Sequence, residues 1–264
     1  MTTTTTWDDP AVAEALAQVR ERGPLTYGLT NYIAAPLTAN LLLAAGASPI
    51  IGGTIEPTFR HFAAVADGVW INLAALNSDP AEALVGAATA AHEAGTPWVL
   101  DPITVGAGSP FNDDLGRQLL GLAPTVVRGN ASEVVALAGG QGASKGVDST
   151  LDSASAVEHA QDLARRTGAV VAVSGPVDYI TDGTGTVAVP GGDLRLTQVT
   201  GVGCSLGALV ASFVATGPDP LRATVAAHAV LARAAETAAA RTRGTGAFAV
   251  ALLDEVSLLG SEER

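Results

Sequence analysis

The stretch 69–101, VWINLAALNSDPAEALVGAATAAHEAGTPWVLD, contains a predicted strand, a helix and a second strand in that order. Val69–Leu73 is a short apolar run of the kind that forms a buried strand. A helix is predicted to begin near Pro80, and Trp98–Asp101 is the next apolar strand. Apolar strands separated by helices are typical of a parallel sheet that is covered by helices on both faces. The stretch therefore predicts an α/β fold.

The same alternation extends in both directions from this stretch. Asp9 as a cap, Pro10 in the first turn and Gly23 beyond the end predict a first helix. The other predicted helices are 38–45, 115–122, one from 132, 154–166, 206–215 and a last one that follows a turn at 243–248. The other predicted strands are 48–52, 125–128, 169–174 and a hairpin of 179–181 with 186–189. No linker, repeat or change of composition divides the chain. We therefore expect one domain over residues 1–264, with residues 1–8 as a flexible tail.

Composition excludes several classes of protein. The 264 residues are 48% hydrophobic and carry a net charge of −12, which argues against a nucleic-acid partner. No apolar run is long enough to predict a membrane span, and Met1–Thr6 does not resemble a signal peptide. The single cysteine cannot form an internal disulfide, so a cytoplasmic protein is expected. The four histidines, His61, His92, His159 and His228, lack metal-ligand spacing and are interpreted as solvated or structural.

A glycine-rich turn at Thr200–Ala208, TGVGCSLGA, precedes the predicted apolar helix 206–215. Gly201 and Gly203 allow unusual backbone dihedrals and a close approach to a ligand. The first-turn N–H groups of the helix would favour an anion, and the same position would lower the pKa of the Cys204 thiol. The alternative is a tight strand-to-helix turn with a small buried cysteine.

Polar residues end the predicted parallel strands, where ligands of open α/β sheets bind. These residues are Asn72, Asp101, Arg128 and Ser174. Asp101 could hold Mg²⁺ or polarise a substrate hydroxyl, or it could cap the following turn. The Ser174 hydroxyl could bind a nucleotide phosphate or only close a turn.

The run Arg128–Glu133, RGNASE, combines a phosphate-binding side chain with a helix start. The planar guanidinium of Arg128 suits phosphate oxygens. Asn130 and Glu133 would share one face of a helix, where they could hold Mg²⁺ through water. They also fit a capping box, and the two interpretations are compatible.

Several of these motifs occur together, in order, in one known family. The chain resembles hydroxyethylthiazole kinases, of the ribokinase-like superfamily, from about Gly23 to Leu259. The motifs that carry the resemblance are LTN at 29–31, TAN at 38–40, GASP at 46–49, LDP at 100–102, RGNASE at 128–133, GVD at 146–148, DYITDG at 178–183 and the glycine turn with Cys204.

The resemblance implies a three-layer α/β/α fold with a mostly parallel central sheet and no lid domain. It implies transfer of the ATP γ-phosphoryl group to the primary hydroxyl of 4-methyl-5-(2-hydroxyethyl)thiazole, in thiamine salvage. The roles that it implies are ATP binding by Arg128, Ser174 and Asn130, catalysis by Gly201, Gly203 and Cys204, acceptor binding by Ile51, Gly201 and Asn31, and Mg²⁺ binding by Asp101 and Glu133. It also implies a homotrimer with acceptor sites at the subunit interfaces.

The chain departs from the family pattern mostly on the acceptor side. Tyr27, Leu37, Ile51 and Ala74 stand where other residues are common, and Val202 replaces a threonine. A kinase for another small alcohol or heterocycle is therefore an alternative. An ATP-dependent nicotinamide-hydrate dehydratase is less favoured, because those enzymes have an aspartate where Cys204 stands. The intact polar residues also argue against a catalytically silent nucleotide-binding module.

Overall fold

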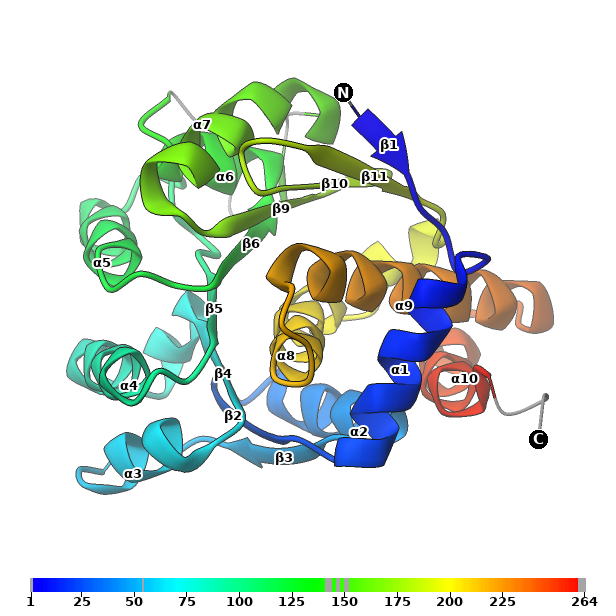
Figure 1. Cartoon of the computed structure of the whole chain (residues 1–264), viewed down its shortest axis with the longest axis horizontal. Helices are drawn as coiled ribbons and strands as arrows, with labels where there is room; N and C mark the ends of the chain where they lie inside the picture. Colours follow the sequence, from blue (N-terminus) through cyan, green and yellow to red (C-terminus); the bar gives the residue numbers. More distant parts are fainter. Residues whose placement is uncertain (1, 54, 141–143, 146–147, 150–151, 261–264) are drawn as a thin grey trace.

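A nine-stranded sheet forms the centre of the protein in a computed structural model that describes residues 2–53, 55–140, 144–145, 148–149 and 152–260 (Figure 1). Its strand order is β1-β11-β10-β9-β6-β5-β4-β2-β3, and within this sheet only β10 runs antiparallel to its neighbours. The strands are β1 (Thr2–Thr4), β2 (Leu25–Leu29), β3 (Ser48–Ile51), β4 (Gly68–Asn72), β5 (Trp98–Asp101), β6 (Val126–Asn130), β9 (Val170–Ser174), β10 (Val177–Thr181) and β11 (Thr186–Pro190). A separate two-residue pair joins β7 (Ser144–Lys145) and β8 (Asp148–Ser149).

Helices cover both faces of the sheet and complete three layers (Figure 1). One layer contains α1 (Pro10–Arg22), α2 (Ala35–Ala45), α8 (Val202–Val214), α9 (Pro220–Arg241) and α10 (Thr245–Leu258). The other contains α3 (Thr58–Val65), α4 (Ala81–Ala94), α5 (Pro110–Leu120), α6 (Ala131–Leu137) and α7 (Val157–Thr167). Each layer buries its own apolar cluster against the sheet. The three-layer, mostly parallel fold is confirmed, and the described residues form no separate lid domain.

Helix α8 lies at the centre of its layer, directly on β2, β4 and β5. Most of its residues are buried, because α2, α9 and α1 cover the side that faces away from the sheet. Its N-terminus at Gly201 is thereby fixed relative to the ends of the central strands.

Most predicted elements occur where the sequence places them, and β5 has the predicted bounds. Helix α1 has Asp9 as its N-cap and Gly23 in a left-handed conformation at its C-cap, as predicted. The predicted helix 154–166 is divided into a 3₁₀ turn, Ser153–Ala156, and α7. Strand β2 and helices α3 and α9 were not predicted at all.

The prediction of a flexible tail over residues 1–8 is wrong for most of that segment. Thr2–Thr4 form β1, which pairs in parallel with β11 at the edge of the sheet. Trp7 then packs against the core cluster of the α8 layer. Threonine is a good strand former, so a run of threonines can complete a sheet edge without any apolar signal. The single domain over residues 1–264 stays a prediction.

Two further predictions concern membrane spans and the GVD motif. Within the part of the chain that the structure describes, every helix is too short or too polar to cross a membrane. Gly146 and Val147 of the GVD motif lie outside the described residues.

Candidate active site

The carboxyl ends of four neighbouring parallel strands meet at one edge of the sheet. Asn72 of β4 is in register with Asp101 of β5, and Asn130 of β6 is in register with Ser174 of β9. The N-terminus of α8 lies at the same edge, since an added Cβ at Gly203 would be 3.9 Å from a guanidinium nitrogen of Arg128. The structure therefore brings together the predicted ATP, metal and catalytic residues.

Arg128 connects two of the strand ends through its guanidinium group. Its Nε and Nη2 donate hydrogen bonds to the Ser174 hydroxyl, at 3.1 and 2.8 Å. Its Nη1 lies 3.6 Å from Oδ2 of Asp101, and both side chains are almost fully buried. The guanidinium is thus held in one orientation between a neutral acceptor and a carboxylate.

Asn130 and Glu133 form a complete capping box at the start of α6. The Asn130 side chain accepts a hydrogen bond from the Glu133 N–H at 3.0 Å, and the Glu133 carboxylate accepts one from the Asn130 N–H at 2.8 Å. The structural interpretation of this motif is confirmed. The cap also holds a buried carboxylate at the edge where the strands end, so it does not exclude a role in binding.

Asp101 and Glu133 are two buried carboxyl groups, and the single positive charge of the Arg128 guanidinium acts on both of them. Burial raises the pKa of Asp101 to about 6, although Arg128 and Asn72 act in the opposite direction. Burial and the nearby Asp101 raise the pKa of Glu133 to about 7. Oδ2 of Asp101 is buried and makes no hydrogen bond with any described residue. The pair therefore has negative charge and ligand capacity to spare, which suits a divalent cation.

Among the described residues there is no cluster of three or more His, Cys, Asp or Glu side chains that could hold a metal ion. A cation between Asp101 and Glu133 would therefore take further ligands from substrate phosphates and water, which is the usual arrangement for Mg²⁺.

Asn72 belongs to the site as well, although the sequence assigned it no specific role. Its Oδ1 accepts a hydrogen bond from the Ala74 N–H at 2.9 Å, which fixes the plane of the amide. Interaction with this side chain lowers the pKa values of both Asp101 and Cys204. The feature of the sequence that indicates Asn72 is its position at the end of a predicted strand.

Glycine is required in the α8 turn for a different structural reason at each position. Gly201, the N-cap, has a φ of +92°, and an added Cβ would lie 3.1 Å from Ala34 Cα. At Gly203 an added Cβ would meet only the Arg128 guanidinium. At Gly207 it would lie 2.5 Å from Nε1 of Trp70. Gly201 thus satisfies a backbone requirement, whereas Gly203 leaves space in front of Arg128.

The expected lowering of the Cys204 thiol pKa is wrong for this structure. Burial raises the pKa to about 12, the Asp101 carboxylate adds to the increase, and Arg128 opposes it. Desolvation and the two carboxyl groups therefore outweigh the favourable position in the first turn of the helix. In this state Cys204 is a neutral thiol at pH 7.

The acceptor-side residues lie at the α2 end of the same edge. Oδ1 of Asn31 accepts hydrogen bonds from the Ile33 and Ala34 N–H groups, and Ala34 lies against Gly201. Asn31 and Gly201 are therefore adjacent through Ala34. Ile51 ends β3, three strands away from β5, and is in register with Gly28. The structure thus groups Asn31 with the α8 turn and places Ile51 on the outermost strand.

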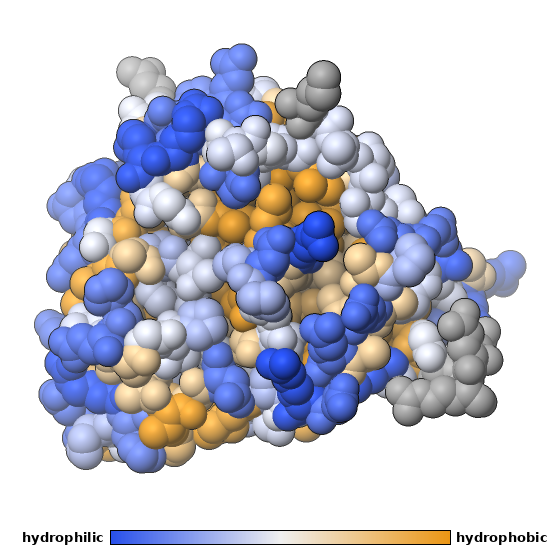
Figure 2. Space-filling model, viewed as in Figure 1, coloured by the Kyte–Doolittle hydropathy of each residue, from blue (hydrophilic) through white to orange (hydrophobic). Residues whose placement is uncertain are grey.

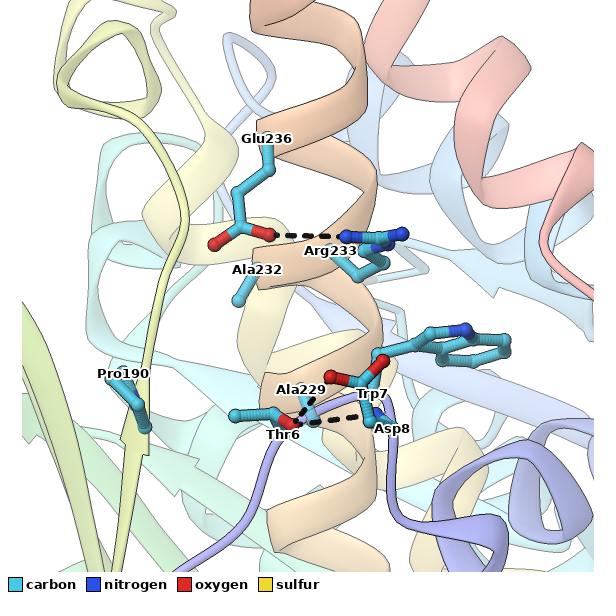
Figure 3. Close-up of a pocket in the computed structure, with 8 residues that line it drawn as sticks. All are labelled: Thr6, Trp7, Asp8, Pro190, Ala229, Ala232, Arg233 and Glu236. Carbon is cyan, nitrogen blue, oxygen red and sulfur yellow. Dashed lines mark hydrogen bonds and ion pairs between the residues drawn. The ribbon is translucent and has the colours of Figure 1, made fainter.

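A separate cavity of about 190 Å³ lies between the N-terminal segment, the end of β11 and α9 (Figure 3). It is lined by Thr6, Trp7, Asp8, Pro190, Ala229, Ala232, Arg233 and Glu236. Figure 3 shows Arg233 and Glu236 paired with each other on α9, and the indole of Trp7 directed away from Pro190. None of the predicted site residues lines this cavity, so it is distinct from the candidate site.

Comparisons with known proteins agree over nearly the full chain. A model of the "Hydroxyethylthiazole kinase family" matches residues 16–262. A hydroxyethylthiazole kinase of Burkholderia pseudomallei is 57% identical over 257 residues, which cover 97% of this chain and 92% of that protein. The solved structure of a hydroxyethylthiazole kinase protein from Pyrococcus horikoshii is 37% identical, has a TM-score of 0.85 and covers 94% of this chain and 93% of its own.

A more distant structure supports the fold alone. A ribokinase-like superfamily protein from Enterococcus faecalis is 11% identical, with a TM-score of 0.67 and coverage of 97% and 95% of the two chains.

Proposed function

Because the chain belongs to the hydroxyethylthiazole kinase family, we propose that it phosphorylates 4-methyl-5-(2-hydroxyethyl)thiazole with ATP, in thiamine salvage. In this reaction the oxygen of the primary hydroxyl forms a bond to the γ-phosphorus of ATP. The bond from that phosphorus to the bridging oxygen breaks, ADP leaves, and the hydroxyl proton is released.

The observation that supports this function most directly is the position of the Arg128 guanidinium beside the N-terminus of α8. A buried guanidinium that is aligned by Ser174 and Asp101 faces the space that Gly203 leaves open. Phosphoryl transfer depends mainly on positioning and on neutralising the charge of the transferred group. Arg128 supplies positive charge, and the first-turn N–H groups of α8 supply hydrogen-bond donors for the same phosphate oxygens.

Asp101 and Glu133 are the proposed Mg²⁺ ligands, directly or through water. Their fit rests on burial, on Oδ2 of Asp101, which faces Arg128 at 3.6 Å but accepts no hydrogen bond from a described residue, and on raised carboxyl pKa values. A bound Mg²⁺ would orient the ATP phosphates and reduce their charge. Asn130 contributes by holding Glu133 through the capping box, so its role on the ATP side is positional.

The Cys204 thiol is proposed to assist the acceptor hydroxyl rather than to act as a thiolate. A group with a pKa of about 12 is a hydrogen-bonding partner at pH 7 and does not carry the negative charge of a strong base. A loose transition state demands little of the base, because the acceptor proton is lost late. Cys204 is therefore expected to increase the rate without being indispensable.

The acceptor is proposed to bind between Asn31, Gly201 and Ile51, at an interface of a homotrimer. Large hydrophobic side chains are exposed on this side of the molecule, including Tyr32 at 68% and Ile55 at 74%. Figure 2 shows hydrophobic surface at the lower edge of the molecule, over the β3 and α3 side. Exposed apolar area of this kind is typical of a surface that a partner covers. We further propose a cytoplasmic location, where ATP is available.

A kinase for another small heterocyclic alcohol is the second candidate. The substitutions that favour it are Tyr27, Leu37, Ile51 and Ala74, all on the acceptor side. Tyr27 is fully buried and its hydroxyl donates to the Gly53 carbonyl at 3.4 Å, so it shapes the loop that follows β3.

The deciding experiment measures ADP release from Mg-ATP with hydroxyethylthiazole and with a panel of small heterocyclic alcohols. Saturable turnover with the thiazole, with a KM between about 1 μM and 1 mM, is the expected result. Turnover with another alcohol alone would overturn the thiazole assignment and retain the kinase. No ADP release with any acceptor, while ATP still binds, would overturn the kinase itself.

A further inference from the structure

His228 is a fully buried histidine in the middle of α9. Its Nδ1 lies 2.6 Å from Oδ2 of Asp178, while its Nε2 is buried and has no hydrogen-bond partner among the described residues. Burying a polar nitrogen without a partner costs free energy. A histidine at this position therefore lowers stability unless its contact with Asp178 offsets the cost or serves the function of the site.

Asp178 connects His228 to the turn between β9 and β10. Its other carboxylate oxygen, Oδ1, accepts a hydrogen bond from the Gly175 N–H at 2.8 Å. Gly175 directly follows Ser174, the residue that accepts both hydrogen bonds from Arg128. One carboxylate thus joins a buried helix to the residue beside the proposed ATP site.

The same turn is fixed from a second side by Ser153. The Ser153 hydroxyl donates to the Val177 carbonyl at 2.7 Å, and an added Cβ at Gly175 would lie 2.5 Å from that hydroxyl. The turn 174–178 is therefore closed by two side chains that come from different parts of the chain. Of the two, only Asp178 is in turn held by a buried helix of the opposite layer.

From this relay we infer that His228 is a positioning residue for the nucleotide site: through Asp178 and Gly175 it fixes Ser174, and Ser174 fixes the plane of the Arg128 guanidinium. The inference rests on the proposed role of Arg128 and Ser174 in binding ATP. His228 itself touches neither substrate. Its loss releases the Asp178 carboxylate, which is 17% exposed and can then turn towards solvent. Ser174 then loses its fixed place opposite Arg128.

The test compares His228→Leu, which removes the donor, with His228→Asn, whose side-chain amide can replace the Nδ1–H. Thr224→Val is the matched control, because Thr224 is buried one turn earlier on α9 and its hydroxyl bonds only within that helix, to Pro220. We expect His228→Leu to raise the KM for ATP about tenfold and to leave the KM for the acceptor unchanged. His228→Asn should recover most of the loss, and Thr224→Val should behave as wild type.

A second measurement separates this relay from general destabilisation. In a Ser174→Ala background, His228→Leu should add little further loss, because residues that act through one another are not additive. Full additivity, or a wild-type KM for ATP in His228→Leu, would overturn the inference. If His228→Leu does not fold, Asp178→Ala breaks the same relay from its partly exposed end, and the same two outcomes decide.

The outcome can be distinguished from failure of the proposed function. Binding of Mg-ATP to the same variants is measured by calorimetry, which needs no acceptor. If wild-type protein binds Mg-ATP but phosphorylates no alcohol, the function fails, and the relay is still judged by the loss of ATP affinity in His228→Leu.

Discussion

The guanidinium group of Arg128 donates two hydrogen bonds to the single hydroxyl oxygen of Ser174. This bifurcated contact joins β6 and β9 at the edge where both strands end. It leaves Nη1 directed towards Asp101, so that a hydroxyl and a carboxylate together determine the plane of the guanidinium.

Removing this hydroxyl is expected to weaken ATP binding without unfolding the protein. In Ser174→Ala the guanidinium loses its neutral acceptor and can rotate towards Asp101. The KM for ATP should rise about 10-fold to 150-fold, as expected for a lost hydrogen bond to a charged group. Ser174→Thr is the control and should retain wild-type kinetics, because it keeps the hydroxyl. Steady-state kinetics with ATP varied and the acceptor saturating make the comparison.

Truncation of Cys204 should reduce the rate only modestly. The thiol is neutral in this structure, so Cys204→Ala removes a hydrogen-bonding partner and not a thiolate. We expect kcat to fall by less than about 100-fold, the lower limit for a general acid–base group. A loss much larger than this would show that the thiol ionises when the substrates bind.

Stability of the ligand-free protein should depend on pH through Asp101 and Glu133. Their folded-state pKa values, about 6 and about 7, lie above the usual values for these groups. A raised carboxyl pKa means that the folded state binds more protons than the unfolded state between about pH 4 and 7. The contribution of these groups to stability is therefore complete below about pH 4 and is lost as the pH rises through 6 to 7.

Glu133→Gln tests this prediction directly, because the amide keeps an oxygen that can accept the Asn130 N–H. The variant should be more stable than wild type at pH 8 by about 1–3 kcal/mol and no more stable at pH 4.5. Thermal unfolding at both values, with and without Mg²⁺, measures the difference. An equal change at both pH values would mean that charge is not its cause. Turnover of the variant should fall if Glu133 holds the cation.

Two glycine substitutions in the α8 turn should separate folding from activity: Gly201→Ala should lower stability, and Gly203→Ala should lower activity. Gly201→Ala forces a left-handed φ on alanine and brings a methyl group to Ala34, so it should destabilise the protein by about 1–2 kcal/mol or more. Gly203→Ala lies within the helix and meets only Arg128, so stability should be unchanged or slightly higher. Its methyl group occupies the proposed phosphate space, and kcat/KM for ATP should fall. Denaturation and kinetics on both variants separate the two roles.

The sequence predicts the framework of the sheet well, because buried strands and capped helices have local signals. β5 and α1 illustrate this, since one is an apolar run and the other carries its own start and stop residues. Helix α9 was missed because it is rich in alanine, which gives little periodic contrast between its faces. β1 was missed because its partner is far away in the sequence.

The site was predicted as a set of residues but not as an electrostatic environment. The strand-end rule alone identified Asp101, Arg128 and Ser174, which the structure then brings together. The state of Cys204 was predicted with the wrong sign, because helix position is a local property whereas burial and the Asp101 carboxylate are properties of the folded chain. The His228–Asp178 contact had no local signal either, since the two residues lie 50 positions apart.

The parallel pairing of Thr2–Thr4 with β11 also affects the order in which the sheet can assemble during synthesis on the ribosome. Residues 186–188 emerge roughly 10 to 40 s after residues 2–4 at ordinary rates of translation. During that interval the threonine strand has no partner, and the strands from β2 to β9 can assemble without it. The first strand in sequence is therefore the last strand of the sheet to find its partner, and it covers an edge of β11 that would otherwise be open to a neighbouring nascent chain.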